Sequence, residues 1–358
     1  MNHPVKKKNM LELAQYQQHL CGFPKLKYLF LEITDQCNLS CRHCGSNCTA
    51  NNHTYLPLEK IKEVLLQVVK AYDAREIMIC ITGGEPFLHP DVYDIVRFAR
   101  RNGFSVGITS NGTLIDEETA NKIVSSGLNT IAVSVDGLAD THDRFRNQKG
   151  SFDIAIRGIN NLKANGADPQ VITVVHPGNI NILQSMFELF QREKISSWRL
   201  VNVDPIGRAR ADSGLLLSRS EIKMLLNFIR DKRFDPDNEM EVTYGCSHFV
   251  SYEYEREIRD YYFQCIAGIQ VASIMANGDI GACLDIERRP ELIQGNVFRD
   301  NFIDVWENGF SVFRSDRSEK SRVCMQCKDR IVCRGDSAHT WDYDEQAPLY
   351  CVKKLLEE

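Results

Sequence analysis

The order of strand-like and helix-like segments between residues 27 and 235 restricts the fold of this chain most strongly. Short apolar runs typical of strands occupy residues 27–34, 76–82, 104–110, 129–135, 170–175 and 197–202. Segments with helical spacing of their apolar residues follow them, at 58–72, 90–101, 116–126, 152–165, 180–193 and 218–231. Strands that alternate with helices form a parallel sheet covered by helices. Six units are too few for the closed eight-stranded barrel, so the sequence predicts an α/β fold with a partial, TIM-like (β/α)6 barrel.

The two ends of the chain lack this alternation of strands and helices. Residues 236–358 are richer in cysteine and aromatic residues, which predicts a second, smaller domain there. Residues 1–26 are an N-terminal extension, and the short run Lys6-Lys7-Lys8 predicts a solvated arm. We therefore expect three parts, at 1–26, 27–235 and 236–358.

The cysteines are numerous and unevenly placed. There are 13, and none lies between residues 81 and 245. The formal net charge of −5 does not favour nucleic-acid binding, and no apolar run approaches the length of a membrane span. The N-terminus has no secretory signal, so we expect a cytoplasmic protein without a membrane partner. In a reducing compartment cysteines more often hold metal or do chemistry than form disulfides.

The segment T-D-Q-C-N-L-S-C-R-H-C follows the first predicted strand and contains Cys37, Cys41 and Cys44. Thiolates are the usual ligands of iron–sulfur clusters, and three of them leave one iron of a four-iron cluster open. The alternative is structural zinc, with Cys48 or His43 as the fourth ligand. Catalytic groups of such folds lie at the C-terminal ends of strands, and Cys37, Gly83, Ser110 and Asp136 all lie there.

With the sequence G-G-E-P at 83–86, this motif resembles the radical S-adenosylmethionine (SAM) superfamily over residues 27–235. The resemblance implies that SAM chelates the open iron of a [4Fe-4S] cluster and is cleaved to a 5′-deoxyadenosyl radical. It also implies which residues bind SAM: Gly83, Gly84, Glu85, Ser110, Asn111, Ser134, Asp136 and Arg146. Arg144 is an alternative to Arg146 for the methionine carboxylate, and we expect His43 to pack beside the cofactor.

The C-terminal cysteines resemble the SPASM domain, an iron–sulfur-binding extension of this superfamily. The resemblance implies one auxiliary [4Fe-4S] cluster ligated by Cys324, Cys327, Cys333 and Cys351, for which zinc is the alternative. Cys265 and Cys283 would begin a second cluster. Ser337 stands where the family has its next cysteine, so one or two auxiliary clusters are expected. Cys246 and Asp336 are the candidate replacements for that missing ligand.

Enzymes of this subgroup mostly modify peptides or proteins, so the resemblance implies crosslinking, epimerisation or oxidation of a ribosomally made peptide. A sulfatase maturase, a non-catalytic iron–sulfur scaffold and a small-molecule enzyme are the alternatives. The 26 residues before the first strand are too few for a peptide-recognition domain. The peptide is therefore captured by the enzyme's own surfaces or by a separate recognition protein, and an electron donor such as flavodoxin or ferredoxin is expected. No catalytic acid or base is identified; Asp285, Glu287, His248 and His339 are candidates only by their place in the cluster-rich region.

Overall fold

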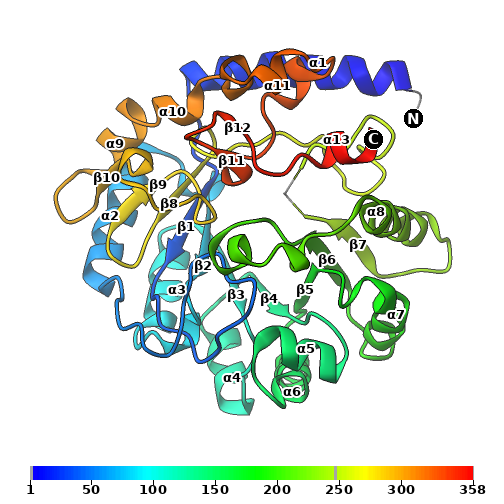
Figure 1. The fold of residues 1–358 in the computed structure, drawn as a ribbon. Helices are drawn as coiled ribbons and strands as arrows, with labels where there is room; N and C mark the ends of the chain where they lie inside the picture. The colour runs from blue at the N-terminus through cyan, green and yellow to red at the C-terminus, as the bar shows by residue number, and fades with distance from the viewer. Residues whose placement is uncertain (1–2, 246–247, 358) are drawn as a thin grey trace.

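A computed structural model describes residues 3–245 and 248–357, and its centre is one curved sheet (Figure 1). Seven parallel strands follow one another in chain order: β1 (Tyr28–Glu32), β2 (Met78–Thr82), β3 (Ser105–Ser110), β4 (Thr130–Ser134), β5 (Gln170–Val175), β6 (Ser197–Asn202) and β7 (Glu241–Tyr244). The helices between them are α2 (Leu58–Ala71), α3 (Val92–Arg101), α4 (Glu117–Ser125), α5 (Ala139–Arg146), α6 (Ser151–Ala164), α7 (Leu183–Arg192) and α8 (Arg219–Phe234). The predicted α/β partial barrel is confirmed, but its parallel part has seven strands in the described residues and not six, because β7 lies beyond residue 235, where the barrel was predicted to end.

The two faces of the sheet differ in exposure. Alternate residues of a strand point to opposite faces, and Ile79 and Ile81 of β2 pack with Ile61 of α2 and Ile95 of α3 in a buried core. The other set faces the inside of the barrel and is only partly buried, as at Cys80. The same alternation recurs in β5 and β6. The inside of the barrel is therefore accessible, whereas the interior of a closed eight-stranded barrel is filled by side chains.

The C-terminal region continues this sheet on its other side. β8 (Val271–Ile274) pairs in parallel with β1, and β9 (Asp279–Gly281) and β10 (Gly295–Asn296) follow it. The remaining elements of the C-terminal region are α9 (Phe302–Asn308), α10 (Ser311–Arg314), α11 (Arg322–Met325), α12 (Arg330–Cys333), β11 (Trp341–Asp342), β12 (Ala347–Pro348) and α13 (Val352–Glu357). Because Ala272 and Ile274 of β8 share a core with Leu29 and Leu31 of β1, the two regions stabilise each other.

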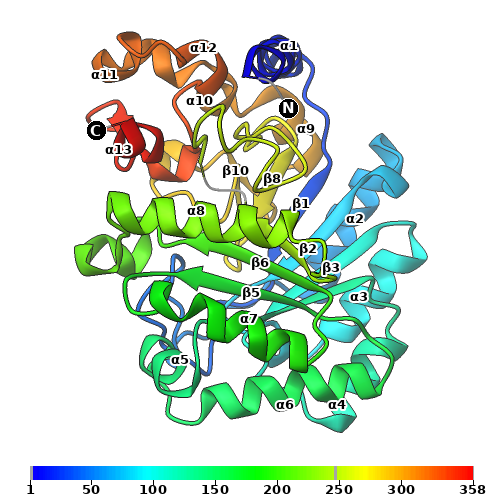
Figure 2. The same cartoon turned by 90° about the vertical axis from the view of Figure 1, so that its right-hand side faces the viewer.

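The N-terminal extension is a helix, α1 (His3–Gly22), that lies against the C-terminal region (Figures 1 and 2). The Lys6 side chain is only 1% exposed and forms an ion pair with Glu257 at 2.6 Å. Gln17 donates a hydrogen bond to the carbonyl of Cys265 at 2.5 Å. The solvated arm predicted from the lysine run is therefore wrong at Lys6, because packing of the helix buries one lysine of the three and supplies its carboxylate partner. No helix in the described ranges has both the length and the apolarity to cross a bilayer.

Candidate active site

The loop of residues 37–44, here called the cluster loop, follows β1 and carries its three thiols on a largely buried surface. Cys37 and Cys41 are buried, and Cys44 is half-buried. Cys37 Sγ accepts a hydrogen bond from the backbone N–H of Leu39 at 3.4 Å, and the amide of Asn111 lies 3.9 Å from the same sulfur. Burial raises the pKa of Cys37 to about 12, and the hydrogen bond from Leu39 only partly opposes this shift. The three thiols lie on one loop, as the predicted cluster requires.

Cys48 supports the third thiol. A hydrogen bond from the Cys48 side chain, helped by the Arg208 guanidinium, lowers the pKa of Cys44 to about 6. The pKa of Cys48 itself is raised, chiefly by that hydrogen bond and by burial, so Cys48 stays protonated as the donor. No three His, Cys, Asp or Glu side chains of the described ranges converge as ligands of a single metal ion.

Gly83 and Gly84 bring the end of β2 into contact with the cluster loop. A Cβ atom on Gly83 would lie 2.4 Å from the carbonyl oxygen of Thr34, and one on Gly84 would lie 2.0 Å from that of Gln36. The N–H of Gly84 donates to the Thr34 carbonyl at 2.7 Å. Glycine is therefore required because two backbones meet here.

Glu85 organises the end of β3. Its carboxylate accepts hydrogen bonds from Ser110 Oγ at 2.9 Å and from the N–H of Asn111 at 2.8 Å. Burial raises the pKa of Glu85 to about 7, although those two hydrogen bonds partly oppose the shift. Glu85, Ser110 and Asn111 thus form one unit, and Asn111 joins it to Cys37.

Asp136 and Arg146 form a buried ion pair beside the cluster loop. Arg146 Nε donates to Asp136 Oδ2 at 2.5 Å, and Arg146 Nη1 lies 3.7 Å from Cys41 Sγ. Burial opposes the charge on Asp136, but the Arg146 guanidinium together with further groups, among them the N–H of Val174, outweighs it, so the pKa of Asp136 is lowered. Arg144 is exposed and donates to the backbone carbonyl of Asp140. The geometry therefore favours Arg146 over Arg144 as the residue near SAM.

Two further predicted residues lie in the same area. His43 stacks on Phe145 with ring centroids 4.3 Å apart, and Phe145 stacks on His176 at 4.0 Å. Burial lowers the pKa of His43 to about 3, so its ring is neutral. Ser134 is buried at the end of β4, two residues before Asp136.

In the C-terminal region the predicted ligands fall into two groups. The first group consists of Cys324, Cys327, Cys333 and Cys351. Burial raises the pKa of Cys351 to about 11, and the charges of Asp336, Cys324 and Cys327 add to the shift. Burial raises the pKa of Cys333 too, and Asp336 and Cys351 contribute. The four thiols of this group are close enough to influence one another electrostatically, which suits a shared cluster.

Cys265 and Cys283 make up the second group. Cys265 Sγ accepts a hydrogen bond from the N–H of Ala338 at 3.4 Å, and Cys283 Sγ lies 4.0 Å from the carboxylate of Asp285. Burial raises the pKa of the Tyr343 hydroxyl, and the charges of Cys265 and Cys283 add to this shift. Ser337, where the family has cysteine, is buried next to Ala338.

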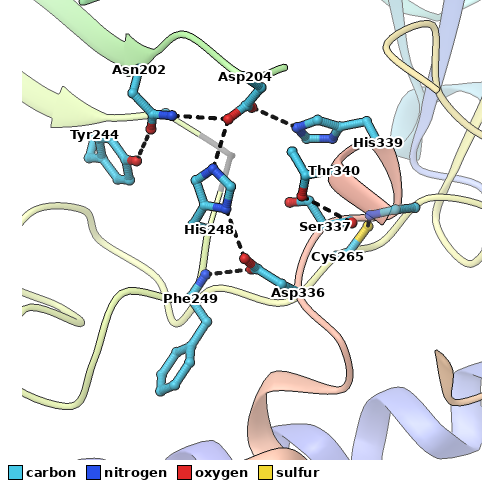
Figure 3. A network of polar contacts seen from close by, with 12 residues as sticks. Asn202, Asp204, Tyr244, His248, Phe249, Cys265, Asp336, Ser337, His339 and Thr340 are labelled. Atoms are coloured by element: carbon cyan, nitrogen blue, oxygen red, sulfur yellow. Dashed lines mark hydrogen bonds and ion pairs between the residues drawn. The ribbon is translucent and has the colours of Figure 1, made fainter. Parts of the chain in front are cut away.

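A buried polar network lies between these cysteines and the end of β6 (Figure 3). Asp204 accepts hydrogen bonds from Asn202 at 2.9 Å, His248 at 2.8 Å and His339 at 2.9 Å. His248 also binds Asp336 at 2.8 Å. Burial opposes the charged form of His248, but the carboxylates of Asp204 and Asp336 outweigh it and raise its pKa to about 10. His248 is therefore an imidazolium between two carboxylates.

This network bears on the missing cluster ligand. Both oxygens of Asp336 are engaged, one by His248 and the other by the N–H of Phe249 at 2.8 Å. Asp336 is thus a poor replacement for the thiolate absent at Ser337, because iron would compete with these hydrogen bonds for its oxygens and soft sulfur suits such clusters better. Cys246, the other candidate, lies outside the described residues.

Sequence reasoning missed Asp204, although the signal was present. Asp204 follows β6 as Cys37 follows β1, and such positions carry catalytic groups in these folds. The segment after Asp204 touches the cluster loop: the N–H of Arg208 donates to the Cys44 carbonyl at 3.1 Å. A Cβ atom on Gly45 would lie 3.2 Å from Ile206 and 3.7 Å from Asp285.

Of the four candidate acids and bases, His248 and His339 join the Asp204 network, and Asp285 lies beside Gly45, which follows the cluster loop. Glu287 instead pairs with Arg210 at the surface.

Comparisons with known proteins concern the two regions that carry these cysteines. The family model of the radical SAM superfamily matches residues 31–189, and that of an iron–sulfur cluster-binding domain, SPASM, matches residues 265–328. An AdoMet-dependent heme synthase of Nitratidesulfovibrio vulgaris is 28% identical over 351 residues, which cover 93% of this chain and 94% of that protein. The mycofactocin maturase MftC of Mycobacterium tuberculosis is 27% identical over 309 residues, with coverages of 85% and 76%.

Solved structures show the same fold. Streptococcus suis SuiB bound to S-adenosylmethionine has a TM-score of 0.75 at 18% identity and covers 94% of this chain and 78% of SuiB. The protein anSMEcpe with bound AdoMet has a TM-score of 0.73 at 17% identity, with coverages of 93% and 92%. The chain therefore belongs to the radical SAM superfamily, as a radical SAM enzyme with a C-terminal SPASM iron–sulfur domain.

Proposed function

We propose that this enzyme abstracts a hydrogen atom from a peptide or protein, as the first step of a post-translational modification of a ribosomally made peptide. The observation that carries the proposal is the accessible inside of the barrel, which leads to the cluster loop. Residues that face it, such as Cys80 on β2 and Arg199 on β6, are not covered by the helices. This partly exposed inner face of the sheet is where a substrate would reach the cluster loop.

The residues near the cluster loop have separate tasks in this proposal. Cys37, Cys41 and Cys44 hold the cluster, which together with SAM supplies a 5′-deoxyadenosyl radical when both are bound. Arg146, fixed by Asp136, presents its guanidinium beside the cluster for the carboxylate of SAM, since arginine recognises carboxylates well. Glu85 fixes Ser110 and Asn111 at the end of β3, where the resemblance puts the ribose.

The relatives support two substrate classes. The mycofactocin maturase favours the peptide. SuiB, whose structure is also solved with the precursor peptide SuiA, is similar to this chain in fold at 18% identity. The heme synthases favour a tetrapyrrole, because their likeness extends over nearly the whole of both chains. A tetrapyrrole is therefore the second candidate. The likeness to anSMEcpe is one of fold and does not favour the sulfatase maturase further.

The test offers both substrates to the reconstituted, reduced enzyme under anaerobic conditions. One sample receives SAM and a synthetic peptide encoded beside the gene, and the other receives SAM and iron coproporphyrin. We expect mass spectrometry to show a changed peptide, and deuterium from labelled peptide to enter 5′-deoxyadenosine. Conversion of the porphyrin with an unchanged peptide would overturn the peptide proposal in favour of the tetrapyrrole.

A further inference from the structure

One arginine from the segment after β6 holds the loop that carries the first three cysteines. The Nε of Arg208 donates a hydrogen bond to the Cys41 carbonyl at 2.7 Å, and its Nη1 donates to the Cys48 carbonyl at 3.1 Å. Its backbone N–H donates to the Cys44 carbonyl at 3.1 Å. Arg208 therefore contacts the chain before, at and after the third thiol, although it lies 167 residues from Cys41 in the sequence.

The preceding glycine brings this segment close to the cluster loop. Gly207 has a φ of +50°, and a Cβ atom there would lie 2.3 Å from the Cys44 carbonyl oxygen and 2.4 Å from that of Gly45. No side chain fits at such distances, so glycine is required for the two backbones to meet. A larger residue would move Arg208 away from the carbonyls that it contacts.

The guanidinium of Arg208 retains a free donor and an unbalanced charge. Its Nη2 is buried and has no hydrogen-bond partner among the described residues. The other two nitrogens contact backbone carbonyls, and Arg208 forms no ion pair with a carboxylate of residues 3–245 or 248–357. The charge of Arg146, which also lies beside the cluster loop, is instead balanced by Asp136. Because a buried donor and a charge without partners are unfavourable, this place requires a negative acceptor.

An iron–sulfur cluster bound by the three thiolates of the loop is such an acceptor. Its sulfur atoms accept hydrogen bonds, and its thiolate ligands make it anionic. The Arg208 guanidinium lies near enough to Cys44 for its charge to lower the pKa of that thiol. The unpartnered Nη2 therefore fits the group that the fold implies at this loop.

We propose that Arg208 is a positioning residue of the radical SAM cluster: it fixes the cluster loop, donates a hydrogen bond from Nη2 to a sulfur of the cluster, and raises the reduction potential of the cluster. This role rests on Cys37, Cys41 and Cys44 as the ligands. Reduction adds one electron from an external donor, so it increases the negative charge that Arg208 faces. Hydrogen bonds to the sulfurs and net charge both set the potentials of such clusters. Because Arg208 is half-buried, salt screens its charge less than that of an exposed cation.

The test measures the reduction potential of this cluster in Arg208 variants. Wild type and Arg208→Gln are reconstituted anaerobically and titrated with dithionite in the presence of redox mediators, and the reduced clusters are followed by electron paramagnetic resonance. The signal that the Cys37→Ala, Cys41→Ala, Cys44→Ala variant lacks identifies the cluster of the loop. We expect Arg208→Gln to lower the equilibrium constant for its reduction at least about tenfold, which is a shift of about 59 mV to more negative potential for one electron.

Two further variants separate the hydrogen bond from the charge and from general effects. Arg208→Lys keeps the positive charge but loses the planar group that reaches several acceptors, so we expect a smaller shift in the same direction. The matched control is Arg210→Gln, because Arg210 lies in the same turn, Gly207–Ala211, but is exposed and pairs with Glu287 at 2.8 Å. Its cluster is expected to have the potential of the wild type.

Several results would overturn this role of Arg208. A wild-type potential in Arg208→Gln, or an equal shift in Arg210→Gln, would do so. If Arg208→Gln binds no cluster at the loop, a wild-type potential in Arg208→Lys decides against the hydrogen bond, and loss of the signal from both variants would leave Arg208 a role in folding of the loop alone. A triple cysteine variant that retains every signal would contradict the ligands themselves. None of these measurements depends on the substrate, so the peptide proposal is tested separately.

Discussion

The barrel half of this enzyme buries an ion pair, and a buried histidine between two carboxylates joins the barrel half to the C-terminal half, but the two groups are built differently. Arg146 and Asp136 are 10 residues apart in the sequence and lie in one strand–helix connection. His248 is 44 residues from Asp204 and 88 from Asp336. The first site is thus assembled by one βα unit, whereas the second exists only when the C-terminal region has folded onto the end of β6. A local site can be read from a motif, but a site assembled at long range cannot.

The largest effect expected from this difference concerns the cluster loop. Replacing Cys37, Cys41 and Cys44 together by Ala removes every thiolate that the loop offers to its cluster. We expect 5′-deoxyadenosine formation to disappear while iron remains bound in the C-terminal region, whose ligands are independent. Liquid chromatography of the nucleoside and iron analysis check this. Undiminished 5′-deoxyadenosine from the triple variant would contradict the assignment of the site.

Arg146 offers a second, slightly smaller effect within the barrel half. Arg146→Lys keeps a positive charge but loses the planar donor group that contacts Asp136 and Cys41 together. We expect SAM cleavage to fall at least about tenfold. The matched control Arg144→Lys lies on the same helix and is exposed, so its activity is expected to equal that of the wild type. Equal losses in the two variants would show that Arg146 has no special role.

The barrel was largely predictable from sequence, and the reasons are physical. The six predicted strands and the helix predicted after each of them occur within a few residues of their expected bounds, because apolar periodicity records which face of each element is buried. Helix α1 was missed, since its buried lysine and its polar residues conceal the face that packs. No rule of residue spacing could predict that Asp204 contacts His248 and His339. His339 lies 135 residues from Asp204, and only the tertiary fold brings them together.

The number of irons per chain shows how many clusters the C-terminal half holds beside the one in the barrel half. Four thiolates can hold one auxiliary cluster, but the group of Cys265 and Cys283 lacks a thiolate at Ser337, and soft sulfur suits these clusters better than a hydroxyl. We therefore expect about 8 irons per chain, from two four-iron clusters. Ser337→Cys should raise this number. Near 12 irons in the wild type, falling to about 8 in a Cys265→Ala, Cys283→Ala variant, would mean that a third cluster is present.

A further expected effect is on the free energy of unfolding and its dependence on pH. The pKa of His248 is raised to about 10, above the ordinary value of 6.5 that it regains on unfolding. Protonation therefore stabilises the fold fully below about pH 6.5, and this contribution is lost as the pH rises through about 10. His248→Gln removes the positive charge between Asp204 and Asp336. We expect it to lower the free energy of unfolding by about 3–5 kcal/mol near neutral pH, and by less near pH 10.

His89 provides the control for this experiment in the barrel half. Its ring is also buried and lies 3.0 Å from the carbonyl of Leu56, but burial lowers its pKa, so it is neutral in the fold. Because the pKa of His89 is lowered in the fold, its effect on stability depends on pH in the opposite direction. Its contribution to the free energy of unfolding is present above the pKa of the unfolded state and is lost as the pH falls. Melting temperatures of the wild type, His248→Gln and His89→Gln across this range should therefore converge at high pH only for the His248 variant. A His248→Gln profile parallel to that of the wild type would mean that His248 is not charged, and that the long-range site is held by neutral hydrogen bonds.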